Sequence, residues 1–145
     1  NGLPRWTEVQ KLYEQYAAEE GDAAEAAKAR AKEMIIQLKD FTRYHFQSSS
    51  VYADNVVSGK RYNSLSTDSK GLALELEVME DSGNGILVVK DGRGTVHRID
   101  ANDPSVKCNL MARDYWFDKT RANASSIYTS SFCVIHELSE PLYAK

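Results

Sequence analysis

The spacing of apolar residues changes once along the chain, near Phe46. Before that point apolar residues recur three and four positions apart, which indicates two amphipathic helices. The first stripe consists of Trp6, Val9, Leu12, Tyr13 and Tyr16, and the second of Ala27, Ala31, Met34, Leu38 and Phe41. A stripe of this kind can also hold a cofactor or a partner. We expect both stripes to face the protein core, because that is the usual role of an apolar helix face.

A polar break separates the two predicted helices. Gly21 is the residue type that most often ends a helix, and Asp22 with Glu25 has the spacing of a capping box for the second helix. The second helix begins with a run rich in alanine, the residue with the highest helix propensity. The first third of the chain is therefore predicted to be helical.

After Phe46 the period becomes two, which is typical of strands. Residues 72–78 alternate between leucine or valine and alanine or glutamate, and residues 86–89 form an apolar run. Residues 95–99 follow a Gly-containing turn and complete a hairpin. We expect a loop over 118–126 and a last strand over Phe132–Leu138. Helices followed by about five to seven mainly antiparallel strands predict an α+β fold.

Composition narrows the class of protein without naming a function. The chain has 145 residues, of which 42% are hydrophobic and 27% charged, so we expect a folded domain rather than a disordered tail. The net charge is -3 and the basic residues are not clustered, which argues against a nucleic-acid partner. No apolar run approaches the roughly 20 residues of a membrane-spanning helix.

The chemistry-bearing residues do not form a recognisable catalytic or metal motif. His45, His97 and His136 lack metal-ligand spacing, and no serine lies in a nucleophile elbow. Cys108 and Cys133 form no C-x-x-C pair, and their oxidation state stays open. We therefore expect no enzyme activity, no metal and no cofactor. His97 is expected to be solvated, and His136 to be mostly buried, neutral and hydrogen-bonded.

Two further features leave alternatives open. The consecutive aromatic residues Tyr115, Trp116 and Phe117 fit a binding patch, or a strand that alternates between the core and a neighbouring layer. Asn123, Ala124 and Ser125 form an N-glycosylation sequon by pattern, which matters only in a source that has this pathway.

Two segments together resemble the fasciclin domain family. The first, Leu38–Phe46, contains the pair Tyr44-His45, and the second, Thr129–Leu142, contains Val134-Ile135-His136. They lie in the family's order, about 90 residues apart, and the likeness covers roughly residues 36 to 143. The opening acidic turn of the family does not occur here. We therefore expect residues 1–145 to be a single fasciclin-like domain of a divergent bacterial surface branch, lacking its first strand and helix.

The resemblance implies N-terminal helices packed on a mainly antiparallel β-wedge or sandwich. It also implies a non-catalytic adhesion or interaction module at the cell surface or outside the cell, for example in a bacterial lipoprotein. Its partner would be a protein or matrix component, and further fasciclin-like domains could adjoin it. The residues singled out for interaction are Tyr44, His45, Val134, Ile135, His136, Tyr115, Trp116 and Phe117. For Tyr44 and His45 we place a structural role before a binding role.

The alternative function is a ligand-binding or sensor domain, with a small molecule held between the helices and the sheet. A sensor domain should contain a well-formed pocket with convergent polar groups. An adhesion module should instead have a packed core and an exposed apolar or aromatic patch. These two expectations separate the functions.

Overall fold

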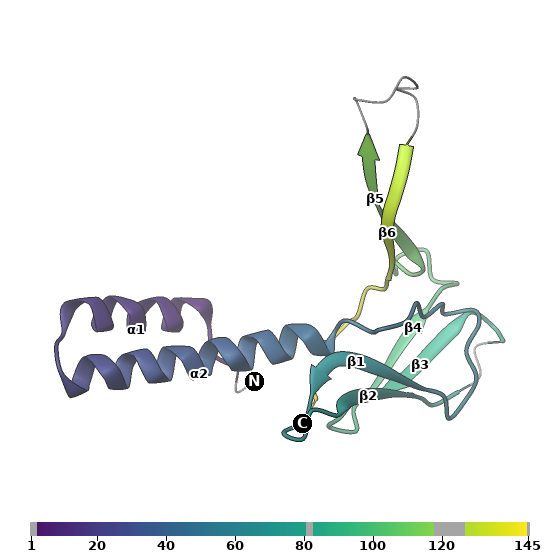
Figure 1. Ribbon diagram of the computed structural model, residues 1–145. Coiled ribbons are helices and arrows are strands. Elements are labelled where there is room, and N and C mark those ends of the chain that lie inside the picture. The colour runs from purple at the N-terminus through teal and green to yellow at the C-terminus, as the bar shows by residue number, and fades with distance from the viewer. Residues whose placement is uncertain (1–2, 81–82, 118–126, 145) are drawn as a thin grey trace. The chain divides into compact units, whose positions relative to one another are not determined.

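The computed structural model of the chain describes residues 3–80, 83–117 and 127–144, with the backbone alone over 111–117 and 127–132 (Figure 1). The chain divides into two compact units. One contains Asn1–Phe46 and Ser64–Leu74, and the other contains Gln47–Asn63 and Glu75–Lys145. Along the described chain two helices come first and six strands follow, which confirms the α+β class.

Helices α1 (Trp6–Ala18) and α2 (Asp22–Tyr44) form an antiparallel hairpin in the first unit (Figure 1). The residues buried on the two helices are Val9 on α1 and, on α2, Ala24, Ala27, Ala31 and Tyr44, the last at the C-terminal end of α2. The predicted core stripe of α2 is thus confirmed at Ala27 and Ala31. Its later positions, Met34, Leu38 and Phe41, are half-buried.

The stripe predicted for α1 is only partly a core stripe. Val9 is buried and Leu12 is half-buried, but Trp6 is 66% exposed and Tyr13 is 48% exposed. The residue types alone suggested burial for all of them. Val9 lies three positions after Trp6 and four before Tyr13, so the three residues share one broad stripe of α1, with Val9 buried and the two aromatic residues at the exposed edge of that stripe.

The helix boundaries also differ from the prediction. α1 is followed by Glu19 as its C-cap, and Gly21 is instead the N-cap of α2, with φ of 71°. The predicted capping box is wrong, because Asp22 and Glu25 both lie in the first turn of α2. There their negative charges favour the helix electrostatically, since the N-terminal end of a helix carries partial positive charge.

Four strands form one sheet in the order β1-β2-β3-β4 (Figure 1). They are β1 (Arg61–Thr67), β2 (Ala73–Val78), β3 (Ile86–Lys90) and β4 (Val96–Asp100). β3 pairs antiparallel with both β2 and β4. The strands predicted over 72–78, 86–89 and 95–99 are confirmed, with ends that shift by at most one residue.

A second, separate hairpin consists of β5 (Leu110–Phe117) and β6 (Ile127–Ile135), paired antiparallel. The last strand therefore begins earlier than the predicted Phe132 and ends before His136. The loop predicted over 118–126 and the sequon at Asn123 lie outside the described residues.

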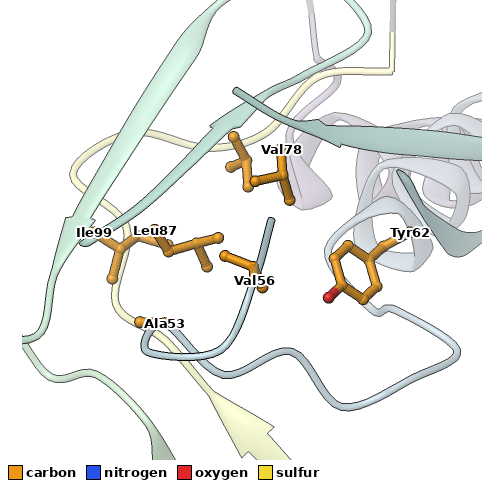
Figure 2. Close-up of a cluster of buried hydrophobic side chains, with 7 residues drawn as sticks. Ala53, Val56, Tyr62, Val78, Leu87 and Ile99 are labelled. Atoms are coloured by element: carbon orange, nitrogen blue, oxygen red, sulfur yellow. The ribbon is translucent and has the colours of Figure 1, made fainter. Parts of the chain in front are cut away.

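The second unit has a hydrophobic core of its own (Figure 2). Its members are Ala53, Val56, Tyr62, Val78, Leu87, Val89 and Ile99, each at most 6% exposed. They come from the loop before β1 and from all four strands of the sheet. This core therefore fixes the segment around Ala53, which carries part of the site described next.

Candidate functional site

The residues of the first predicted motif lie at the end of α2. Tyr44, the last residue of the helix, is 0% exposed. The Nδ1–H of His45 donates to the carbonyl oxygen of Phe41 at 2.9 Å, and the two rings meet edge to face with centroids 4.7 Å apart. Both side chains therefore pack within the protein, as a structural role at the helix terminus requires.

The residues of the second motif lie at the end of β6, in the other unit. Val134 is half-buried and pairs with Met111 across the hairpin, whereas Ile135 is 46% exposed and pairs with Leu110. The aromatic residues Tyr115–Phe117 belong to β5, and their side chains lie outside what the structure describes. Their use as a binding patch stays a prediction.

His136 bridges two segments that are distant in sequence. Its Nε2–H donates to the carbonyl oxygen of Val51 at 2.8 Å, and its Nδ1 accepts the backbone N–H of Asn109 at 3.3 Å. An amide N–H can only donate, so Nδ1 must carry a lone pair and the imidazole is neutral. The predicted hydrogen bonding is confirmed, although the residue is half-buried rather than mostly buried.

Cys108 stands beside the same imidazole. Its Sγ lies 3.2 Å from Nδ1 of His136, within range for an S–H donor. Burial raises the pKa of this thiol, the N–H of Asn109 lowers it, and the charges of Asp54 and Asp100 raise it again, with a raised pKa as the net result. Cys108 is therefore a protonated thiol at neutral pH, and its sulfur lies within hydrogen-bond distance of the imidazole of His136.

Asn109 lies next to Cys108 and contacts both His136 and the loop before β1, and we call the group of Cys108, Asn109 and His136 the Cys108–His136 corner. It is the one non-glycine residue with positive φ among the described residues, at 52°, a conformation that Asn adopts more readily than most side chains. Its Oδ1 accepts the N–H of Ala53 at 2.9 Å, and its own N–H faces His136. One residue thus ties the loop before β1 to the histidine.

Sequence reasoning missed this corner. Cys108 and His136 are 28 positions apart, and His136 and Val51 are 85 positions apart. No local pattern links such residues. Cys108 and His136 meet because the β5–β6 pairing places the start of one strand beside the end of the other.

A second buried polar cluster lies at the β3–β4 turn. His97 was expected to be solvated, and this prediction is wrong: it is 4% exposed, with Nε2 at 3.2 Å from Oδ2 of Asp91. The Asp91 carboxylate also accepts the backbone N–H groups of Arg93, Thr95 and Tyr143 at 2.9 to 3.0 Å. The carboxylate is the partner that makes a buried imidazole tolerable.

These contacts set the charge state of Asp91. Burial by itself raises the pKa of the carboxyl, but hydrogen bonds from Tyr143, His97, Thr95 and Arg93 outweigh it. The pKa of Asp91 is therefore below its ordinary value, and the group is a carboxylate at neutral pH.

The same turn holds the C-terminal segment. A Cβ atom at Gly92 would lie 1.7 Å from the carbonyl oxygen of Ala144, so only glycine allows the two backbones to come this close. The guanidinium of Arg93 lies 4.2 Å from the ring centroid of Tyr143, and Leu142 is buried. The cluster at the β3–β4 turn therefore holds the C-terminal segment in place, and the Asp91 carboxylate is used for this purpose through its hydrogen bond from Tyr143.

A groove of about 530 Å³ runs between α1 and α2. It is lined by Leu3, Pro4, Glu8, Lys11, Leu12, Arg30, Met34 and Gln37. Its lining combines apolar side chains with two cationic ones, Lys11 and Arg30, and one anionic one, Glu8, so its net charge of +1 suits an amphiphilic anion better than a purely apolar molecule.

Within the described ranges, no three His, Cys, Asp or Glu side chains come together as metal ligands, and no helix has the length and apolar character needed to cross a bilayer. The described contacts therefore leave three features open to function: the Cys108–His136 corner, the groove, and the exposed face of α1. Models of known protein families, the curated proteins and the solved structures contain no match to this chain.

Proposed function

We propose that this chain is a non-catalytic interaction module of the fasciclin type, acting at the cell surface or outside the cell on a protein or matrix partner. The observation that carries the proposal is the exposed aromatic face of α1, on which Trp6 is 66% and Tyr13 is 48% exposed. Large aromatic side chains are enriched at protein interfaces, where they supply much of the binding energy.

The setting of this face supports the proposal. Trp6 and Tyr13 lie two helical turns apart, so one partner surface can cover both. On α2, Ile36 is a further large apolar residue with 45% exposure. Removing apolar side chains of this size from water lowers the free energy, which favours their burial against a partner.

The state of the histidines is consistent with a non-catalytic role. His45 and His97 hydrogen-bond to Phe41 and Asp91, and His136 bridges Val51 and Asn109. Each contact holds chain segments together, and His45 and His97 have no hydroxyl or thiol nucleophile among these partners.

Adhesion of purified, labelled protein to whole cells and to matrix-coated surfaces tests the proposal. The double variant Trp6→Ala, Tyr13→Ala should lose about tenfold or more in affinity, since interface aromatics commonly contribute over 1 kcal/mol each. Leu72→Ala is the matched control, because Leu72 is 64% exposed in the same unit but lies on a loop. Equal binding by the wild type and the double variant would contradict the proposal.

The groove between α1 and α2 favours a second candidate function, the binding of a small amphiphilic anion. The probe is 1-anilinonaphthalene-8-sulfonate, which carries aromatic rings and one negative charge. Its fluorescence should rise with wild-type protein and fall in the variant Lys11→Ala, Arg30→Ala, because both cations line the groove. An unchanged signal in that variant would exclude the groove as the dye site.

A further inference from the structure

We propose that Cys108 is a site of S-thiolation, at which the thiol attacks a small-molecule disulfide with His136 as its base. The inference is independent of the proposed interaction function. It rests on three groups that the fold brings together: the thiol of Cys108, the imidazole of His136 and the amide of Asn109.

The histidine is placed as a base should be. Nδ1 faces the sulfur at 3.2 Å, and the opposite nitrogen is held by the carbonyl oxygen of Val51 at 2.8 Å. That second bond fixes the tautomer, so the lone pair is on the nitrogen that faces the thiol. A nucleophile within reach of a base that is oriented by a third group is the arrangement that activates thiols.

The backbone N–H of Asn109 can stabilise the thiolate of Cys108. This N–H points to Nδ1 at 3.3 Å and also acts on the sulfur of Cys108, where it favours the charged form. When the proton moves from sulfur to Nδ1, this N–H loses its acceptor on the ring and keeps one on the thiolate. The positive φ of Asn109 aims the amide into this position.

The reaction balances with the disulfide as the only co-reactant. The sulfur of Cys108 bonds to one sulfur of the disulfide while its proton passes to Nδ1 of His136. The original S–S bond breaks, and the leaving thiolate takes the proton from Nδ1. The products are a mixed disulfide at Cys108, a free small thiol and a regenerated neutral imidazole. The negative charge moves to the leaving sulfur, so the step needs no oxyanion hole.

Cys133 provides an internal comparison in the same molecule. It is exposed on β6, whereas Cys108 is half-buried. If access alone controlled the reaction, Cys133 would react faster. If the base controls it, Cys108 reacts faster despite its burial.

The experiment treats the reduced, folded protein with bis(2-hydroxyethyl) disulfide at pH 7 and follows both cysteines by peptide mass spectrometry. Trypsin separates them, because Lys107, Arg113 and Arg121 place Cys108 and Cys133 in different peptides. We expect Cys108 to form the mixed disulfide about tenfold faster than Cys133, which is less than the roughly hundredfold gain from a positioned base because Cys108 is half-buried and Cys133 is exposed. An equal or faster reaction at Cys133 would overturn the proposal.

His136→Asn tests the base directly. Asparagine offers an acceptor near the position of Nδ1 but cannot take up the proton, so the Cys108 rate should fall about a hundredfold while the Cys133 rate stays constant. His45→Asn is the matched control and should change neither rate. An unchanged Cys108 rate in folded His136→Asn would refute the role of the base. Far-UV circular dichroism shows whether His136→Asn is folded, and if it is not, the comparison of the two cysteines within the wild type decides alone.

Discussion

At the scale of single residues, the most informative side chain is His136. It holds Val51 through one nitrogen and Asn109 through the other. Replacing it with alanine leaves a carbonyl and an amide without their partner and opens a cavity. His136→Ala should therefore lower the free energy of unfolding by about 1–3 kcal/mol, measured by urea denaturation. Ser139→Ala, an exposed change three residues on, is the control. An unchanged midpoint for His136→Ala would refute the structural role.

The stability contributed by the Asp91 carboxylate should depend on pH. Its pKa is lower in the folded chain than the ordinary 3.8, so its stabilisation is complete above that value and is lost as pH falls through the folded-state pKa. Asp91→Asn should lower stability at pH 7 by about 1.5–3 kcal/mol, the usual value of hydrogen bonds to a charged group. Denaturation at a series of pH values should show this difference shrinking below pH 4. A difference that stays constant down to pH 2 would contradict the account.

At the scale of elements, the apolar period predicted where helices and strands lie, but not which polar residues are buried. β4 illustrates the limit, since Val96 is 55% exposed while its neighbour His97 is buried. Exposed and buried residues do alternate along β4, but the buried positions are those of His97 and Ile99 and not that of Val96. The cause is Asp91, which supplies a buried partner across the turn, and sequence spacing gives no measure of that.

The β3–β4 turn packs against the C-terminal segment, and a substitution at Gly92 tests this contact. Gly92→Ala introduces a Cβ that would meet the Ala144 carbonyl oxygen at 1.7 Å, so the chain end must move. The variant should lose stability by about 1–3 kcal/mol, as overpacked sites do, and its last residues should be cut faster by carboxypeptidase. Gly83→Ala is the control, because no atom lies within 4 Å of its Cβ position. Identical digestion of Gly92→Ala and the wild type would show that the contact is not tight.

At the scale of the whole molecule, the two units differ in how they bury apolar surface. The strand unit encloses a core of larger aliphatic residues and a tyrosine, whereas the helical hairpin buries chiefly alanines and leaves Trp6 and Tyr13 in contact with water. A helix pair with so small a core gains little from its own packing. Association with a partner through the aromatic face would add the apolar contact that the hairpin lacks.

The sequence contained part of this account. The helical stripe included Trp6 and Tyr13, but their exposure depends on which part of the stripe meets α2, and Val9 is buried while the two aromatic residues at the edge of the stripe are not. The corner formed by Cys108 and His136 depends on strand pairing, which the order of residues does not reveal. Local periodicity therefore predicted the elements, and tertiary contacts determined the candidate sites.

The most direct test of the proposed function follows the accessibility of Trp6. In the variant Trp116→Phe, Trp6 is the sole tryptophan and reports alone. Acrylamide should quench its fluorescence readily in the free protein, and the quenching constant should fall severalfold when a solubilised matrix partner is bound, because interface aromatics become buried. Binding that leaves the quenching of Trp6 unchanged would contradict the claim that α1 presents the interaction surface.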